Sequence, residues 1–226
     1  VYSGIFAQYA NFGWSPSSED PAVTDRPAID RWILSRLTQV EDEANAYLER
    51  FDATQAARLV MEFVEEDVSR WHVRRSRARF YDVDGADNRA AFATLHEVLV
   101  VACRLLAPFC PFVTDWLHRE LTGRSVHLAP YVREGARHRD EGLEQAMAQV
   151  RELVTLGLSA RTQAKLRVKQ PLARMVCVVP QARVDALVPL VPLLQDELNV
   201  KQVEFAGSAD ALVHLEAKAN FRTLGK

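Results

Sequence analysis

The sequence predicts a mainly α fold, with a helical bundle over residues 1–135 followed by a small α/β domain over residues 136–226. Three observations support this division. Apolar residues recur at helical spacing through the first part. A polar connection containing Pro130 and Gly135 then interrupts the pattern. Beyond it, short β-branched runs such as 175–179 alternate with helical segments, which is the order expected for an α/β domain.

The first part is expected to begin with two helical segments. Residues 1–11 form a short aromatic stretch that is typical of the end of a helix, and a loop rich in Ser, Pro and Asp follows. The next helix is long and amphipathic. Thr24 or Asp25 can cap it, and Pro27 falls in its first turn, where a missing backbone N–H has no cost.

Three further helices complete the predicted bundle. Asp52 can cap a helix that continues to about residue 82. The following helix, 88–106, is apolar nearly all round in its second half, which places it in the middle of the bundle. Pro108 and Pro111 separate it from a fifth helix that ends at Gly123.

The second part is expected to combine helices and short strands. A long helix over 141–165 comes first, and a β-like run over 175–179 follows. The helix over 184–198 should be irregular because it contains two prolines. Two further strands are expected at 203–205 and 212–215.

Composition excludes several classes of protein. The formal net charge of −2 means that any nucleic-acid surface must be a local patch. The longest apolar stretch, 98–113, is too short and too interrupted to span a bilayer, so we expect no membrane association. Three cysteines without a CxxC pair favour a reducing compartment, and Cys103 and Cys110 are expected in the core.

No motif for catalysis or metal binding occurs in the sequence. It contains no Gly-rich phosphate loop, no nucleophile elbow and no pair of histidines at metal-ligand spacing. We expect its carboxylates to lie on outward helix faces as ordinary solvated side chains. We therefore predict no catalytic residue and no metal site in this chain.

A first cationic cluster lies near the end of the third predicted helix. Arg70, Arg74 and Arg77 share one side of that helix, which is the arrangement of a helix that contacts phosphates. Arg75 follows Trp71 by one turn, so we expect it to be partly buried and paired with a carboxylate. The alternative is a helix end whose arginines pair with acidic residues of the same helix, namely Glu62, Glu65 and Glu66.

A second cationic cluster lies where the last long helix ends. The apolar stripe of that helix consists of Leu143, Met147, Val150, Val154 and Leu158. At the same spacing the stripe reaches Arg161 and Lys165, and Arg167 and Lys169 extend the charge beyond the helix. We predict that these four cations point outward toward an RNA backbone. The alternative, complementing the helix dipole, would account for Lys165 alone.

Several segments of the sequence resemble isoleucyl-tRNA synthetases, which are class I aminoacyl-tRNA synthetases. The bundle segments 30–37, 69–80 and 106–112 are similar to the anticodon-binding bundle of the isoleucyl, valyl and leucyl enzymes. Three later segments are more specific. Arg161 with 167–172, the stretch 197–204 and the stretch 220–226 resemble the isoleucyl "R-KQPL", "ELNVK-VE" and "NF-TLGKK" runs of the eukaryote-like bacterial branch.

The resemblance implies both a partner and a role. The full-length enzyme would join isoleucine to tRNA(Ile) in the cytoplasm, using ATP and Mg²⁺. Its HIGH and KMSKS signatures do not occur in this sequence. We therefore expect this chain to bind the anticodon arm, without DNA, membrane or cofactor, beside the catalytic domain of the same chain. The alternatives are a helical protein-interaction scaffold and the equivalent part of a valyl-tRNA synthetase.

Overall fold

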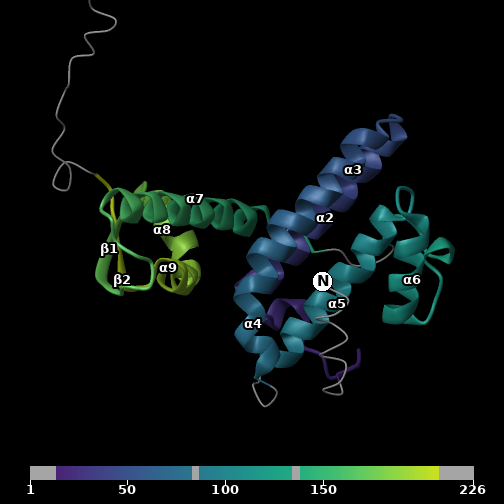
Figure 1. Ribbon diagram of the computed structural model, residues 1–226, viewed down its shortest axis with the longest axis horizontal. Coiled ribbons are helices and arrows are strands. Elements are labelled where there is room, and N and C mark those ends of the chain that lie inside the picture. The colour runs from purple at the N-terminus through teal and green to yellow at the C-terminus, as the bar shows by residue number, and fades with distance from the viewer. Residues whose placement is uncertain (1–13, 83–86, 134–137, 209–226) are drawn as a thin grey trace, which may run out of the picture. The chain divides into compact units, whose positions relative to one another are not determined.

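The computed structural model describes residues 14–82, 87–133 and 138–208 (Figure 1). These residues fall into two compact units, Val1–Glu144 and Gln145–Lys226. The predicted boundary after residue 135 falls among residues outside the described ranges and stays a prediction. The first unit includes the start of α7 (Glu141–Gln163). There, Ser35 Oγ on α2 (Ala28–Glu49) accepts a hydrogen bond from Asp140 N at 2.7 Å and donates one to Glu144.

The first unit is a bundle of helices, as predicted. Its core contains large side chains from several helices, including Trp32, Leu37, Phe63, Phe80 and Phe92. The described helices of this unit are the 3₁₀ turn η1 (Val23–Asp25), α2 (Ala28–Glu49), α3 (Ala53–Glu62), the π-helix η2 (Phe63–Val73), α4 (Arg74–Tyr81), α5 (Asn88–Leu106), α6 (Pro111–Thr122) and the 3₁₀ turn η3 (Val126–Leu128). Helix α2 packs against α3, η2 and α5, and α5 also packs against α4 and α6.

Most of the predicted helix signals hold in this unit. Asp52 caps α3 by accepting a hydrogen bond from Gln55 N, and Gly123 ends α6 in a left-handed conformation at φ 72°. The predicted cap of α2 by Thr24 or Asp25 is wrong. Those residues belong to η1, and Pro27 stands at the start of α2 without a side-chain cap. The predicted helix over residues 1–11 lies outside the described residues.

The third predicted helix is continuous but changes its winding. It is α-helical as α3, π-helical through η2 and α-helical again as α4. Three consecutive side chains at the end of η2, those of Trp71, His72 and Val73, are buried. Cys103 is buried in α5 as predicted. Cys110 is exposed, so its prediction was wrong: it lies outside the helix, at the N-cap of α6.

The second unit contains a two-stranded parallel sheet with helices between its strands. Strand β1 (Leu172–Val178) pairs with β2 (Val200–Ala206), in a register that sets Leu172 opposite Val200 and Val178 opposite Ala206. The connection between them consists of α8 (Gln181–Leu187), the 3₁₀ turn η4 (Val188–Leu190) and α9 (Val191–Leu198), all preceded by α7 (Glu141–Gln163). The irregularity expected from the prolines is confirmed by η4. The predicted strand over 212–215 lies outside the described residues.

A mainly α fold with a small α/β part is therefore confirmed. Parallel strands need a long crossover, and the α8–η4–α9 segment provides it. Leu187, Leu190, Leu194 and Leu198 of this crossover are buried. Among the described residues, no helix is both long and apolar enough to cross a membrane.

Candidate nucleic-acid interface

Helix α7 ends in a Schellman motif, a C-terminal cap in which one residue adopts a left-handed conformation. Leu166 N donates to Arg161 O at 2.8 Å, and Lys165 N donates to Thr162 O at 3.1 Å. Lys165 occupies the left-handed position at φ 56°, where glycine is the usual residue. The cap turns the chain away from the helix and leaves the Lys165 side chain exposed.

The exposed loop beyond the cap, residues 164–170, carries three cations. Lys165, Arg167 and Lys169 are all exposed, and none forms an ion pair with any described residue. Gln170 N donates to Arg167 O at 3.0 Å, which closes a tight turn around Val168 and Lys169. The next cation, Arg174, differs because it pairs with Glu204 at 3.4 Å on the neighbouring strand. The loop therefore presents three positive charges that the described part of the chain does not neutralise.

Arg161 corrects the prediction that all four cations point outward. Its side chain is buried, with 4% of the residue exposed. Its Nη1 donates to Arg167 O and Gln170 O at 3.1 Å each. Its Nη2 donates to Leu198 O at 2.6 Å and Asn199 O at 3.2 Å. The face of α7 that carries the apolar stripe therefore remains buried at Arg161. Backbone carbonyls accept the hydrogen bonds of its guanidinium there, which leucine side chains could not do.

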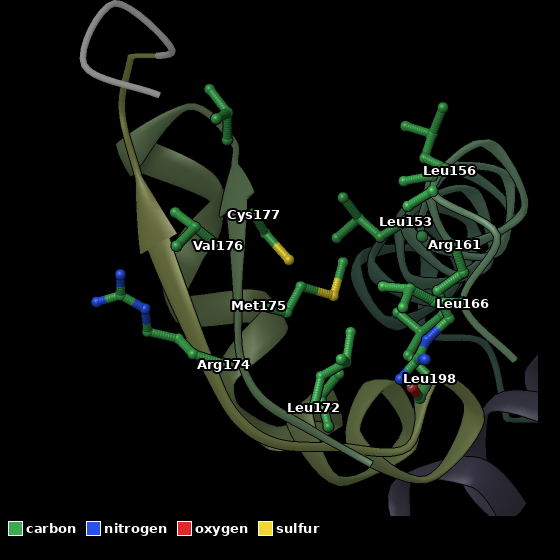
Figure 2. A pocket seen from close by; sticks show the side chains of 15 residues that line it. Leu153, Leu156, Arg161, Leu166, Leu172, Arg174, Met175, Val176, Cys177 and Leu198 are labelled. Carbon is green, nitrogen blue, oxygen red and sulfur yellow. Dashed lines mark hydrogen bonds between the residues drawn. The ribbon is translucent and has the colours of Figure 1, made fainter. Parts of the chain in front are cut away.

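Gly157 makes room on α7 for the side chain of Leu198, the last residue of α9. Gly157 lies one helical turn before Arg161, on the same face of α7. A Cβ atom built on Gly157 would lie 2.7 Å from Leu198 Cδ1, closer than two carbon atoms can pack. The absence of that atom leaves room for the Leu198 side chain against α7, and the Leu198 carbonyl accepts a hydrogen bond from the Arg161 guanidinium. Figure 2 shows Arg161 and Leu198 side by side.

Asn199 is a contributor to this loop that sequence reasoning did not single out. It ends α9 in a left-handed conformation at φ 48°, and its Nδ2 donates to Val168 O at 3.0 Å. The signal in the sequence was an asparagine directly after a predicted helix, because asparagine is among the residues that tolerate this conformation. The partner of its side chain is thirty-one positions away, so only the fold could identify it.

The first cationic cluster is partly neutralised. Arg70 is exposed but pairs with Glu65 at 2.6 Å and with Glu66, as the alternative interpretation predicted. Arg74 and Arg77 are exposed on α4. These three residues remain candidate RNA contacts, although the charge of Arg70 is already compensated within its own helix.

The other arginines of this segment have structural roles. The Arg75 guanidinium lies 3.1 Å from the centroid of the buried Trp71 ring and donates to Trp71 O. The expected partial burial is confirmed, and the guanidinium makes a cation–π contact with the Trp71 ring. The expected carboxylate partner stays a prediction. Arg79 pairs with Asp30 and Asp87 at 2.5 Å each. No group of three or more potential metal ligands occurs among the described residues.

Comparison with known proteins identifies the family. Residues 30–176 match the family described as the anticodon-binding domain of tRNA ligase. The chain belongs to this family. The resemblance found in the sequence is confirmed, and the matched residues include the whole of α7 and most of β1.

The relatives of this anticodon-binding chain are isoleucine–tRNA ligases. It is 41% identical to the enzyme of Deinococcus radiodurans over 230 residues, which cover 100% of the chain and 21% of that protein. It is 41% identical to the enzyme of Chlamydia trachomatis serovar L2b, over 92% of the chain and 21% of that protein. It is 40% identical to the Streptomyces avermitilis enzyme, over 100% and 22%. The chain thus spans about a fifth of the length of these relatives.

An apolar cavity of about 490 Å³ lies next to the cationic loop in the anticodon-binding chain. It runs between α7 and β1, and Figure 2 shows Met175 and Cys177 directed toward the helix while Arg174 points away. Burial raises the pKa of the Cys177 thiol, so this thiol is a weak nucleophile. The lining is almost entirely apolar apart from Arg161 and Arg174, which does not suit an anionic ligand such as a phosphate group.

Lys165→Gly is expected to change stability and binding in opposite directions. Removing the left-handed strain should stabilise the second unit by about 1 kcal/mol. Loss of one exposed cation should weaken tRNA binding about fivefold near 0.15 M salt. Hydrogen exchange of the β1–β2 ladder would report stability, and a salt titration would report binding. Ala164→Gly is the matched control and should destabilise the unit; a destabilised Lys165→Gly protein would contradict the prediction.

Proposed function

We propose that this chain binds the anticodon arm of tRNA(Ile) as part of an isoleucine–tRNA ligase. The main observation behind this proposal is the exposed 164–170 loop, in which Lys165, Arg167 and Lys169 form no ion pair with any described residue. Cations that lack internal partners on a fixed backbone suit contact with a phosphate backbone. Membership of the anticodon-binding family and the names of the relatives support the same assignment.

We propose that contacts with phosphates provide most of the affinity, while other side chains recognise the anticodon bases. Each neutralised phosphate releases condensed counterions, so the affinity should fall as salt rises. The unstacked bases of an anticodon loop offer edges for hydrogen bonds and faces for stacking with arginine or aromatic planes. Arg74 and Arg77 on α4 are proposed as secondary phosphate contacts, and Arg70 as a weaker one because Glu65 and Glu66 already pair with it.

The activity of the larger protein belongs to the same proposal. The relatives are named isoleucine–tRNA ligases, and we infer that the protein containing this chain joins isoleucine to tRNA with ATP and Mg²⁺ in the cytoplasm. ATP, the metal ion and the catalytic groups are assigned to parts outside this sequence. The exposed aromatic side chains of α6, Phe112 and Trp116, offer an apolar surface for the catalytic domain of the same chain.

The test compares two RNA hairpins at several salt concentrations. One is the anticodon stem-loop of tRNA(Ile), and the other has the same stem with changed anticodon bases. The chain should bind the first more tightly. Binding should weaken roughly 20- to 60-fold between 50 and 200 mM salt if about three phosphates are contacted. Equal affinity for both hairpins together with indifference to salt would remove the proposal and favour a protein-interaction scaffold.

A further inference from the structure

The buried guanidinium of Arg161 has an unusual set of partners. All four of its hydrogen bonds go to backbone carbonyls, and no carboxylate among the described residues forms an ion pair with it. A buried charge is costly unless fixed dipoles replace the water that it has lost. Two of the four carbonyls, those of Leu198 and Asn199, lie at the C-terminal end of α9, where the helix dipole is negative. The carbonyls at this site therefore compensate the charge.

The same four hydrogen bonds connect two segments that are distant in the sequence. Nη1 binds the carbonyls at both ends of the turn from Arg167 to Gln170, and Nη2 binds the end of α9. A planar guanidinium presents donors in several fixed directions, which allows one side chain to hold both segments. A lysine ammonium is a compact point charge and could not span the four acceptors. Arg161 therefore fixes where the turn lies relative to α9.

The cations of the 164–170 loop are attached directly to this fixed backbone. Arg167 contributes one of the carbonyls that Arg161 holds, and Lys169 is adjacent to Gln170, which contributes another. Asn199 adds a second connection through its side-chain bond to Val168 O, between the two held positions. The loop is thus held through three carbonyls, those of Arg167, Val168 and Gln170, while its charged side chains remain exposed. Loss of the anchors would leave the charges in place but let their spacing vary.

We propose that Arg161 is a positioning residue: it sets the affinity for tRNA by holding the cationic loop in its binding shape, without itself touching RNA. This inference rests on the proposed tRNA binding. A loop that is competent in only a fraction of molecules binds more weakly by that fraction. The number of phosphates contacted in the complex does not change, because Lys165, Arg167 and Lys169 are all still present.

The deciding experiment measures tRNA(Ile) affinity as a function of salt for four variants of the chain. Arg161→Met removes both the charge and the four hydrogen bonds. Arg161→Lys keeps the charge and removes the four-carbonyl geometry. Asn199→Gly keeps the left-handed backbone, which glycine adopts readily, and removes the bond to Val168. Arg183→Lys, on the exposed surface of α8, is the matched control for the arginine-to-lysine change. Hydrogen exchange is measured in parallel on the 164–170 loop and on strand β1.

A positioning role predicts a specific combination of results. Arg161→Lys should weaken binding about tenfold, as expected if the fraction of molecules with a binding-competent loop falls to about a tenth. The salt slope, meaning the slope of log affinity against log salt concentration, should not change. Exchange in the loop should accelerate while β1 stays protected. Asn199→Gly should weaken binding about three- to tenfold in the same way, consistent with one net hydrogen bond. Arg183→Lys should behave like the unmodified chain.

Different failures have different meanings. If Arg161→Lys binds as the unmodified chain does, the positioning role is refuted, because charge alone suffices. A smaller salt slope in Arg161→Met, with full rescue in Arg161→Lys, would show a direct phosphate contact and overturn the proposal. If Arg161→Lys unfolds the second unit, the test rests on Asn199→Gly alone. Unchanged tRNA(Ile) affinity in the Asn199→Gly variant would then refute the inference. If the unmodified chain shows no salt-dependent binding, it is the proposed function that fails.

Discussion

Replacing Asp30 by alanine is expected to lower the free energy of unfolding of the first unit by about 3–5 kcal/mol. Asp30 lies in the first turn of α2 and is completely buried. Its Oδ1 accepts hydrogen bonds from His72 Nε2 at 2.8 Å and Arg79 Nη1 at 2.9 Å, and its Oδ2 accepts one from Arg79 Nη2 at 2.5 Å. Without the carboxylate, the buried imidazole loses this hydrogen bond, and the largely buried Arg79 guanidinium keeps only Asp87 and Ser76 as partners.

Two controls separate the buried charge from the network as a whole. Asp87→Asn changes the other carboxylate that pairs with Arg79, but that side chain is 45% exposed, so a loss below about 1 kcal/mol is expected. Asp30→Asn retains an acceptor for His72, so its loss in the free energy of unfolding should lie between those of Asp30→Ala and Asp87→Asn. All four tryptophans, Trp14, Trp32, Trp71 and Trp116, belong to the first unit, so their fluorescence during urea unfolding reports on that unit alone. Equal losses for the alanine variant and Asp87→Asn would contradict the prediction.

The same network should make the first unit sensitive to acid. Burial alone would raise the pKa of the Asp30 carboxyl, but hydrogen bonds from Arg79 and His72 and their charges bring that pKa below its ordinary value. A carboxyl with a lowered pKa in the folded state contributes stability above its unfolded pKa of about 4. That contribution is lost as the pH falls through the folded-state pKa. In the Asp30→Asn variant, the stability of the unit should therefore depend less on pH below about 4.

Removing all three loop cations is expected to produce the largest loss of binding. The triple variant Lys165→Ala, Arg167→Ala and Lys169→Ala should bind tRNA(Ile) about 100-fold more weakly near 0.15 M salt. Its slope of log affinity against log salt should decrease in magnitude by between two and three. The reason is that three phosphate contacts and their released counterions are lost together. Filter binding across a salt series measures both quantities.

A control variant that loses the same number of charges tests whether tRNA affinity depends on the loop or only on the net charge of the chain. The exposed residues Arg50, Arg58 and Arg183 lie elsewhere on the chain, and their triple alanine variant removes the same three charges. Its affinity should change by only a few-fold and its slope by less than about one. If both triple variants lose affinity equally, binding is non-specific attraction to the chain as a whole, and the loop loses its assigned role.

Specificity for the amino acid is a separate question from RNA binding. A valine enzyme would share the helical bundle, so binding of an anticodon arm does not distinguish the two. The alternative is tested by asking whether the full-length protein charges tRNA(Ile) with isoleucine or tRNA(Val) with valine. The relatives, at 40–41% identity across nearly the whole chain, are isoleucine–tRNA ligases and favour the first outcome.

Local sequence signals determined most of the helical architecture. The spacing of apolar residues located α2 and α5, Asp52 located the start of α3, and Gly123 located the end of α6. These signals act within a few residues of the feature that they specify, because a helix satisfies its hydrogen bonds within its own segment. The π-helical winding of η2 gave no such signal in the sequence, and we have no physical account of its length.

For the cationic loop, the sequence determined which charges are present, and tertiary structure decided which of them face solvent. Lys165, Arg167 and Lys169 were identified from their positions and are exposed. Arg161 has the same charge and continues the same stripe, yet it is buried. The difference comes from two carbonyls at the end of α9, thirty-seven and thirty-eight residues away, which accept hydrogen bonds from the Arg161 guanidinium. A charge pattern along one helix contains no information about acceptors that another segment brings to it.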